Sequence, residues 1–210
     1  MDDMVKRAQA QKSQRPARPP HRREPGPERQ RTLTLRNRQR LRRVDLRLLR
    51  RIVQSLLREL WPNGSVDLVI YVVAGPEMTR LNEAFLRHKG STDVITFDYS
   101  ERVGQASRLS NSGARAQPSK ASGDVCPARL HSEIFVCLDE AVSQAHRFHA
   151  TWQSELVRYA VHGVLHLLGY DDCNDRARRK MKMAEDTLVQ ELARQFDFHR
   201  LGISRSRVRI

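Results

Sequence analysis

The segment 161–172 constrains the fold of this chain more than any other, because it holds three metal-ligating side chains at a compact spacing. His162 and His166 are four residues apart, and on a helix such residues lie on one face with Cβ atoms roughly 5–6 Å apart, so both imidazoles can reach one ion. Gly169 follows where the helix can end, since glycine readily adopts the left-handed conformation that turns a chain back. We therefore expect Asp172 to reach the same ion.

Three protein ligands leave a tetrahedral zinc site one position short, which is the arrangement of a catalytic site and not of a structural one. The sequence thus predicts one Zn²⁺ held by His162, His166 and Asp172. The alternative is that the histidine pair belongs to a half-buried helix face, but the glycine turn and the acid that follows favour a metal. Cys173 is a soft donor and an alternative third or fourth ligand.

The residue after the first histidine is also informative. In zinc proteases of the H-E-x-x-H type this position holds a glutamate that serves as the general base. Here it is Gly163. Peptide hydrolysis is therefore the less favoured chemistry, and another substrate is indicated.

The whole segment resembles the signature H-G-x-L-H-L-x-G-Y-D-H of the YbeY endoribonucleases, which are bacterial rRNA maturation factors. The departure is at the last position, where Asp172 stands in place of the family's usual third histidine. Aspartate is also a zinc ligand, although its charge makes the metal less electrophilic.

Two upstream segments extend the resemblance. Residues 81–97 are similar to the family segment L-N-x-x-Y-R-G-x-x-x-x-T-D-V-L-S-F, with Leu86 at the place of the family's functional arginine and Arg87 next to it. Arg87 is therefore the candidate for that role by a shift of one residue. Residues 131–136 stand where the family usually has L-G-D-I-x-I, so that Glu133 keeps a carboxylate. The alternative for Glu133 is a solvated charge at the start of a strand.

The resemblance implies a zinc-dependent, single-strand-specific endoribonuclease that acts in rRNA processing, at the 3′ end of small-subunit rRNA, and in ribosome biogenesis. Its catalytic residues would be Arg87 and His162, and its partners would be rRNA precursors and the small ribosomal subunit with its proteins. Two alternatives stay open. One is a metalloprotease-like zinc hydrolase, which needs a carboxylate base, and the other is a non-catalytic RNA-binding assembly factor, which would close its zinc with a fourth ligand such as Cys173.

The charge of the chain agrees with a polyanionic partner. The net charge is +14, and residues 31–60 contain ten arginines against two acids. Neutralising phosphates with such residues releases counterions and favours binding. Solubility alone is the competing explanation.

Cysteines and hydropathy indicate the compartment. Cys126, Cys137 and Cys173 form neither a C-x-x-C pair nor an even-numbered framework, so we expect reduced thiols, no disulfide-linked partner and a cytoplasmic protein. No stretch has the roughly 20 apolar residues that a membrane span needs, and the N-terminus lacks a secretory signal.

Periodicity predicts a small mixed four-stranded sheet covered by helices, an α/β (α+β) fold in a single domain. The expected strands are 32–36, 66–73, 93–98 and 133–138, and the expected helices are 44–60, 77–86, 139–149, 152–168 and 174–195.

Three segments should lie outside this core. Residues 1–30 hold five of the nine prolines and a net charge of +4, which predicts a disordered basic leader. The domain proper is expected over 31–198, with a flexible insertion at about 100–130 that would be either an unstructured insertion, which we favour, or a flap near the site. Residues 199–210 form a basic tail, either an added β-edge or an RNA-binding arm.

Overall fold

The computed structural model describes residues 30–100 and 129–202. The strands are β1 (Arg31–Asn37), β2 (Ser65–Val73), β3 (Val94–Asp98) and β4 (Arg129–Cys137). The α-helices are α1 (Leu46–Leu60), α2 (Gly75–Leu81), α3 (Leu138–Arg147), α4 (Trp152–Leu167) and α5 (Asp175–Gln195). A π-helix, η1 (Asn82–Leu86), continues α2, and a 3-10 helix, η2 (Phe198–Leu201), follows α5. The predicted order of strands and helices is confirmed.

The strands form one mixed four-stranded sheet in the order β1-β2-β4-β3. β1, β2 and β4 run parallel, whereas β3 runs antiparallel to β4 at the edge. The connection from β1 to β2 contains α1, because parallel neighbours need a crossover. The predicted fold class, a small mixed sheet covered by helices in a single domain, is confirmed.

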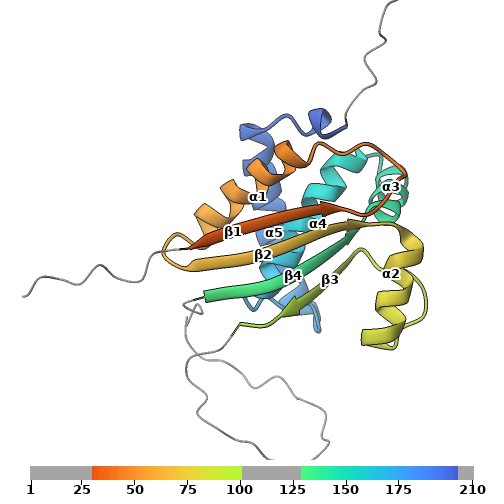
Figure 1. Cartoon of the computed structure of the whole chain (residues 1–210), viewed down its shortest axis with the longest axis horizontal. Coiled ribbons are helices and arrows are strands. Elements are labelled where there is room, and N and C mark those ends of the chain that lie inside the picture. The colour runs from red at the N-terminus through yellow and green to blue at the C-terminus, as the bar shows by residue number, and fades with distance from the viewer. Residues whose placement is uncertain (1–29, 101–128, 203–210) are drawn as a thin grey trace, which may run out of the picture.

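Helices α1, α4 and α5 lie behind the sheet and cover one of its faces (Figure 1). Alternate side chains of β2 point to these helices, and Leu68 and Ile70 are completely buried. Leu49 of α1 and Leu156 of α4 belong to the same apolar cluster. Burial of this apolar surface, the main favourable contribution to folding, holds α4 against the sheet.

The opposite face of the sheet is covered at one end only. There α2 and η1 close a second, smaller cluster of buried residues, which consists of Val73, Met78, Ile95, Phe135 and Cys137. In Figure 1 the remainder of this face is turned toward the viewer, with none of the described helices in front of it.

Most element limits differ from the prediction by one or two residues, and the helix expected at 77–86 is divided into α2 and η1. α1 begins at Leu46 and not at residue 44, because the Asp45 carboxylate accepts hydrogen bonds from the backbone N–H groups of Arg47 and Leu48 and so caps the helix. β4 begins at Arg129, four residues before the predicted start, because it pairs with β2 from Ser65 onward. The expected insertion therefore ends before residue 129. Most of it, 101–128, and the leader 1–29 lie outside the described residues.

The folded part continues past residue 198. Leu201 of η2 is completely buried, and Gly202 forms a β-bridge with Val44. The first residues of the expected tail thus pack on the domain, while 203–210 lie outside the described residues. No helix in the described ranges has both the length and the apolar composition needed to cross a membrane.

Candidate metal centre

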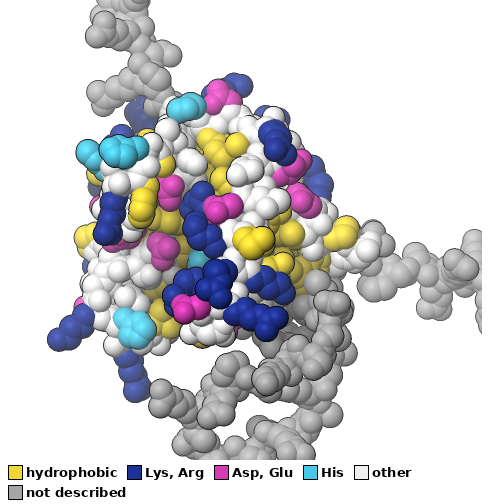
Figure 2. Space-filling view, turned by 180° about the vertical axis from the view of Figure 1, so that it is seen from behind, with side chains coloured by type: hydrophobic (Ala, Val, Ile, Leu, Met, Phe, Trp, Pro, Cys, Tyr) yellow, Lys and Arg dark blue, Asp and Glu magenta, His cyan; other side chains and the backbone are white. Residues whose placement is uncertain are grey.

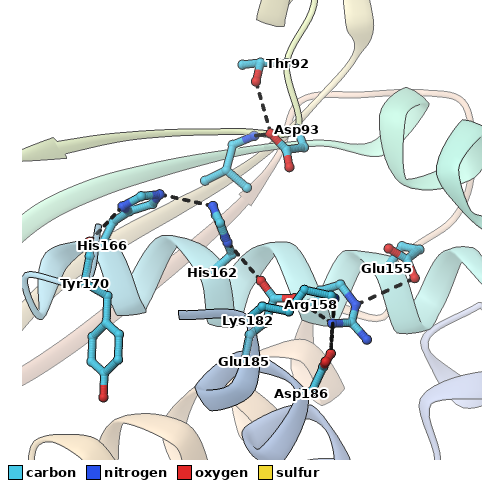
Figure 3. Close-up of polar contacts among 11 residues, drawn as sticks. Thr92, Asp93, Glu155, Arg158, His162, His166, Tyr170, Lys182, Glu185 and Asp186 are labelled. Atoms are coloured by element: carbon cyan, nitrogen blue, oxygen red, sulfur yellow. Dashed lines mark hydrogen bonds and ion pairs between the residues drawn. The ribbon is translucent and has the colours of Figure 1, made fainter. Parts of the chain in front are cut away.

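Helix α4 presents His162 and His166 side by side. Their ring centroids are 4.6 Å apart, and the two Nε2 atoms face each other at 3.1 Å (Figure 3). This is the arrangement that the four-residue spacing predicted. Both rings are partly buried, so the space between them is shielded from bulk water on the side of the core.

The hydrogen bonds of the two Nδ1 atoms determine whether each Nε2 carries a proton or a lone pair. Nδ1 of His166 lies 3.1 Å from the carbonyl oxygen of Tyr170, and Nδ1 of His162 lies 2.9 Å from Oε2 of Glu185. A carbonyl or an ionised carboxylate only accepts hydrogen bonds, so both Nδ1 atoms carry the proton. In the neutral rings each Nε2 then presents a lone pair. Two lone pairs at 3.1 Å repel unless a proton or a cation lies between them, and the donor set therefore fits a metal ion.

The turn after α4 brings in the third predicted ligand. Gly169 has φ 85°, the left-handed conformation expected of it. The N–H of Gly169 donates to the carbonyl of His166 at 2.9 Å, and the N–H of Tyr170 donates to that of Leu165 at 3.0 Å, which together form a Schellman motif. This helix end also aims the Tyr170 carbonyl at the His166 ring.

Asp172 lies in the same group. Single ligand atoms of His162, His166 and Asp172 are all within 4.8 Å of one another, and Asp172 is exposed at the open side. Arg178 donates from Nη2 to the Asp172 carbonyl oxygen at 3.2 Å and so ties this loop to α5. Cys173 groups with Asp171 and Asp172 but not with the two histidines. Within the described residues the arrangement is therefore a three-ligand group with one open side.

Sequence reasoning missed Glu185, which holds His162 from α5. Glu185 is 7% exposed, and its second oxygen, Oε1, accepts from Nη1 of Arg158 at 2.5 Å. The same Nη1 atom also donates to Asp186 at 2.5 Å. Figure 3 shows this chain of contacts running from His166 through His162 and Glu185 to Arg158 and Asp186.

The contacts along this series of residues shift the pKa values of Glu185 and His162. Burial raises the pKa of Glu185, but hydrogen bonds from His162 and Arg158 outweigh it and hold the pKa below its usual value. Burial lowers the pKa of His162, but the hydrogen bond and charge of Glu185 outweigh this and raise it above its usual value. Glu185 is thus a carboxylate that makes the His162 ring a stronger base, as outer carboxylates do at metal-bound histidines.

A signal for Glu185 was present in the sequence. The buried face of α5 consists of Met181, Glu185, Leu188, Val189 and Leu192. An acid in the middle of an otherwise apolar helical stripe must find a partner in the core, because an unpaired buried charge is costly. The spacing indicated that a partner exists, but not that it is His162.

Close packing of α4 against the sheet explains why residue 163 is a glycine. A Cβ atom at this position would lie 2.8 Å from Cγ2 of Ile134 in β4 and 3.3 Å from Cγ1 of Val94 in β3. The absence of a side chain lets α4 approach the sheet closely. A glutamate of the protease type has no room here, in agreement with the less favoured protease reading.

Arg87 makes no polar contact with this group in the part of the chain that the structure describes. Arg87 is exposed, has φ 58° and ends η1. No hydrogen bond or ion pair joins its side chain to the two histidines or to Asp172 within the described ranges. Asp93, from the same family-like segment, does influence the site, because its charge contributes to the raised pKa of His162.

Glu133 is not part of the centre. Its neighbour Ile134 points to α4, so Glu133 lies on the opposite face of the sheet. There it accepts hydrogen bonds from the hydroxyls of Tyr71 at 3.1 Å and Tyr99 at 3.3 Å. It is a partnered residue in the middle of β4 and not a solvated charge at a strand start.

Known proteins resemble this chain over most of its length. A family model described as endoribonuclease YbeY matches residues 34–193. An endoribonuclease YbeY of Chlorobium luteolum is 31% identical over 154 residues, which cover 73% of this chain and 93% of the relative. One of Chlorobium phaeovibrioides is 33% identical over 128 residues, 61% of this chain and 68% of the relative. The solution structure of a Thermotoga maritima protein covers 85% of this chain and 100% of its own, with a TM-score of 0.50 and 22% identity, which shows the shared fold.

Proposed function

Because the chain belongs to the YbeY endoribonuclease family, we propose that it is a zinc-dependent enzyme that cleaves single-stranded RNA in rRNA processing. The observation that supports the metal dependence is the facing of the two Nε2 atoms at 3.1 Å, with Asp172 in the same ligand group. Maturation of the small-subunit rRNA 3′ end, contact with the small ribosomal subunit and a cytoplasmic location are parts of this proposal.

His162, His166 and Asp172 would hold the ion. When bound there, zinc would act as a Lewis acid toward a phosphoryl oxygen and would make a water molecule more acidic. Glu185 keeps the proton of His162 on Nδ1, and the Tyr170 carbonyl does the same for His166, so both Nε2 atoms stay available.

Basic side chains would bind the phosphodiester. Figure 2 shows lysines and arginines gathered on the helix side of the molecule, with acidic residues among them. The first half of α5, directly after Asp172, contributes exposed basic residues, namely Arg176, Arg178, Arg179, Lys180 and Lys182. We also keep Arg87 as a candidate phosphate ligand and catalytic residue, since its exposed side chain is free to meet the substrate.

Removal of the histidine ligands tests the proposal. The variants His162→Ala and His166→Ala should lose zinc and RNA cleavage together while they remain folded, because a site with an open position contributes less to the core than a closed one. His146→Ala, a change of an exposed histidine at the end of α3, is the matched control. Zinc content, circular dichroism and cleavage of single-stranded and duplex RNA are measured. Cleavage that persists in both zinc-free variants would refute the proposal.

A further inference from the structure

The sheet face opposite α4 carries a group of adjoining aromatic rings, which we call the aromatic face. Its members come from β2, η1, β3, the residue after β3, and β4, and they are Tyr71, Phe85, Phe97, Tyr99, His131 and Phe135. Successive ring centroids are 4.6 to 6.4 Å apart. The rings thus form a continuous surface across three neighbouring strands.

The outer rings of this face are open. Phe85 is 61% exposed and Tyr99 is 52% exposed, although both are large aromatic side chains. They flank Phe97, with Phe85 packed edge-on at 5.1 Å and Tyr99 parallel to it at 6.4 Å. Exposed rings that rest on a partly buried ring such as Phe97 are restrained by that contact, so binding a flat ligand to them costs less side-chain entropy.

An arginine at the margin of the aromatic face is available to an anionic chain. The three acids at this face have partners of their own, because Glu133 accepts from Tyr71 and Tyr99, Asp67 lies 3.7 Å from Nε2 of His131, and Glu77 pairs with Arg38 at 2.8 Å. Arg36 is exposed and stands in register with Tyr71, and no ion pair involves it in the described residues. Arg36 and Tyr71 line a depression of 550 Å³ together with Asn37 and Arg38. The guanidinium of Arg38 lies over the Tyr71 ring.

The aromatic face also has a route to the metal centre. β3 is the edge strand of the sheet, and its side chains alternate between the two sides. Val94 faces Gly163 of α4, while Phe97 belongs to the aromatic face. An extended chain that lies on the aromatic face reaches the α4 side by passing over one strand.

We propose that the aromatic face binds single-stranded RNA, with bases stacked on Phe85 and Tyr99 and a phosphate neutralised by Arg36. Every base has a flat π-face, so such a platform accepts unpaired nucleotides of any sequence, whereas bases inside a duplex are not available to it. The inference rests on the proposed function for the identity of the ligand, and it adds a second contact that selects single strands away from the metal ligands.

Binding is measured with the full-length protein carrying His166→Ala to suppress cleavage, by fluorescence anisotropy of a short labelled single-stranded RNA. Phe85→Leu and Tyr99→Leu should each weaken binding about tenfold, since a leucine keeps apolar bulk but cannot stack. Phe148→Leu, a change of a 66% exposed ring at the end of α3, is the matched control and should have no effect. Tyr99→Phe should keep the affinity.

Salt and duplex RNA separate stacking from charge. Arg36→Gln should reduce the slope of log affinity against log salt concentration by about one, because one counterion fewer is released. The leucine variants should leave that slope unchanged. The affinity for a duplex of the same length should be equal in wild type and in the leucine variants. A uniform loss for single-stranded and duplex RNA would overturn the stacking model.

Two further outcomes would overturn the proposal. One is unchanged single-strand affinity in the folded Phe85→Leu/Tyr99→Leu double variant. The other is a shift in oligomeric state by light scattering with no change in RNA affinity, which would assign the aromatic face to contacts between copies of this chain. Zinc content and cleavage are measured separately, in proteins that keep His166. If those proteins do not cleave RNA, the binding result remains interpretable. If the aromatic face does not bind RNA, the cleavage result remains interpretable.

Discussion

At the scale of single residues, the two histidines and their partners form one hydrogen-bonded unit. The Nδ1 atoms of His162 and His166 are each held by an acceptor, and the Nε2 atoms are thereby turned toward each other. Glu185 is central to this arrangement because one of its oxygens holds His162 while the other accepts from Arg158. The two candidate ligands are therefore oriented by the protein itself.

Glu185→Gln tests this positioning role. An amide carries no charge and can present its NH₂ group to His162, so we expect zinc affinity to fall about 10- to 100-fold, the usual effect of losing an outer partner of a metal-bound histidine. Cleavage should recover when zinc is added in excess, because the ligands themselves remain. Glu191→Gln, which alters a half-buried acid of the same helix that pairs with Arg194, should keep wild-type affinity. A Glu185→Gln protein with normal zinc affinity would show that Glu185 only stabilises the fold.

Asp172 is the position at which this chain departs from the family signature. Asp172→His should keep zinc and cleavage, because an imidazole replaces a carboxylate at the same place, whereas Asp172→Ala should lose both. Cys173→Ser is the matched control and should be without effect, since Cys173 does not group with the histidines. Zinc titration and cleavage assays of the three variants decide whether Asp172 or Cys173 is the third ligand. If Asp172→Ala is fully active and Cys173→Ser is not, the third ligand is Cys173.

At the scale of elements, the contact between α4 and the sheet determines where the histidines lie. Gly163 allows this contact, and the Schellman motif at Gly169 ends the helix one turn later and returns the chain toward its own last turn. The site is therefore built from one helix, its end and one side chain of α5. Rigid elements of this kind hold ligands more accurately than loops do.

Gly163→Ala tests the close approach. The added methyl group would meet Ile134 at 2.8 Å, and overpacking of this kind costs about 1–3 kcal/mol of unfolding free energy. Ile134→Ala removes the obstructing atoms, so the double variant should be more stable than the sum of the two single changes predicts. Chemical denaturation of the wild type, the two single variants and the double variant gives the coupling free energy between the two positions. Strict additivity would mean that the helix moves away without cost.

At the scale of the whole molecule, the sheet separates two surfaces with different chemistry. One side carries α1, α4, α5 and the candidate metal centre, and the other carries the aromatic face. The net charge of +14 attracts a polyanion to both sides without specifying either. Under the two proposals, specificity would come from the candidate metal ligands and from the rings.

Deletion of residues 1–29 tests how the charge is divided. These residues have few large apolar side chains and a net charge of +4. We expect unchanged melting temperature and zinc content, because such a sequence has little to bury, and a weaker, less salt-dependent affinity for RNA. Differential scanning calorimetry and anisotropy measure the two effects. A large fall in melting temperature would show that the segment packs on the domain.

The sequence by itself determined the features that depend on neighbours along the chain. Helical spacing placed His162 beside His166, and glycine supplied the left-handed turn at Gly169. The spacing after Gly169 indicated Asp172 as the third member of the group, and the order of periodic segments predicted the fold class. These features follow from local periodicity, because the backbone geometry of one element decides which of its side chains share a face.

Only the tertiary structure decided which faces meet. Glu185 is 23 positions after His162, and the rings of the aromatic face come from segments on both sides of residues 101–128. Periodicity shows that Glu185 lies on a buried stripe and that Phe97 lies on one side of a strand, but the partner of each depends on how helices and strands pack. Strand order and the close approach of α4 at Gly163 result from the burial of the whole core, to which residues far apart in the chain contribute together.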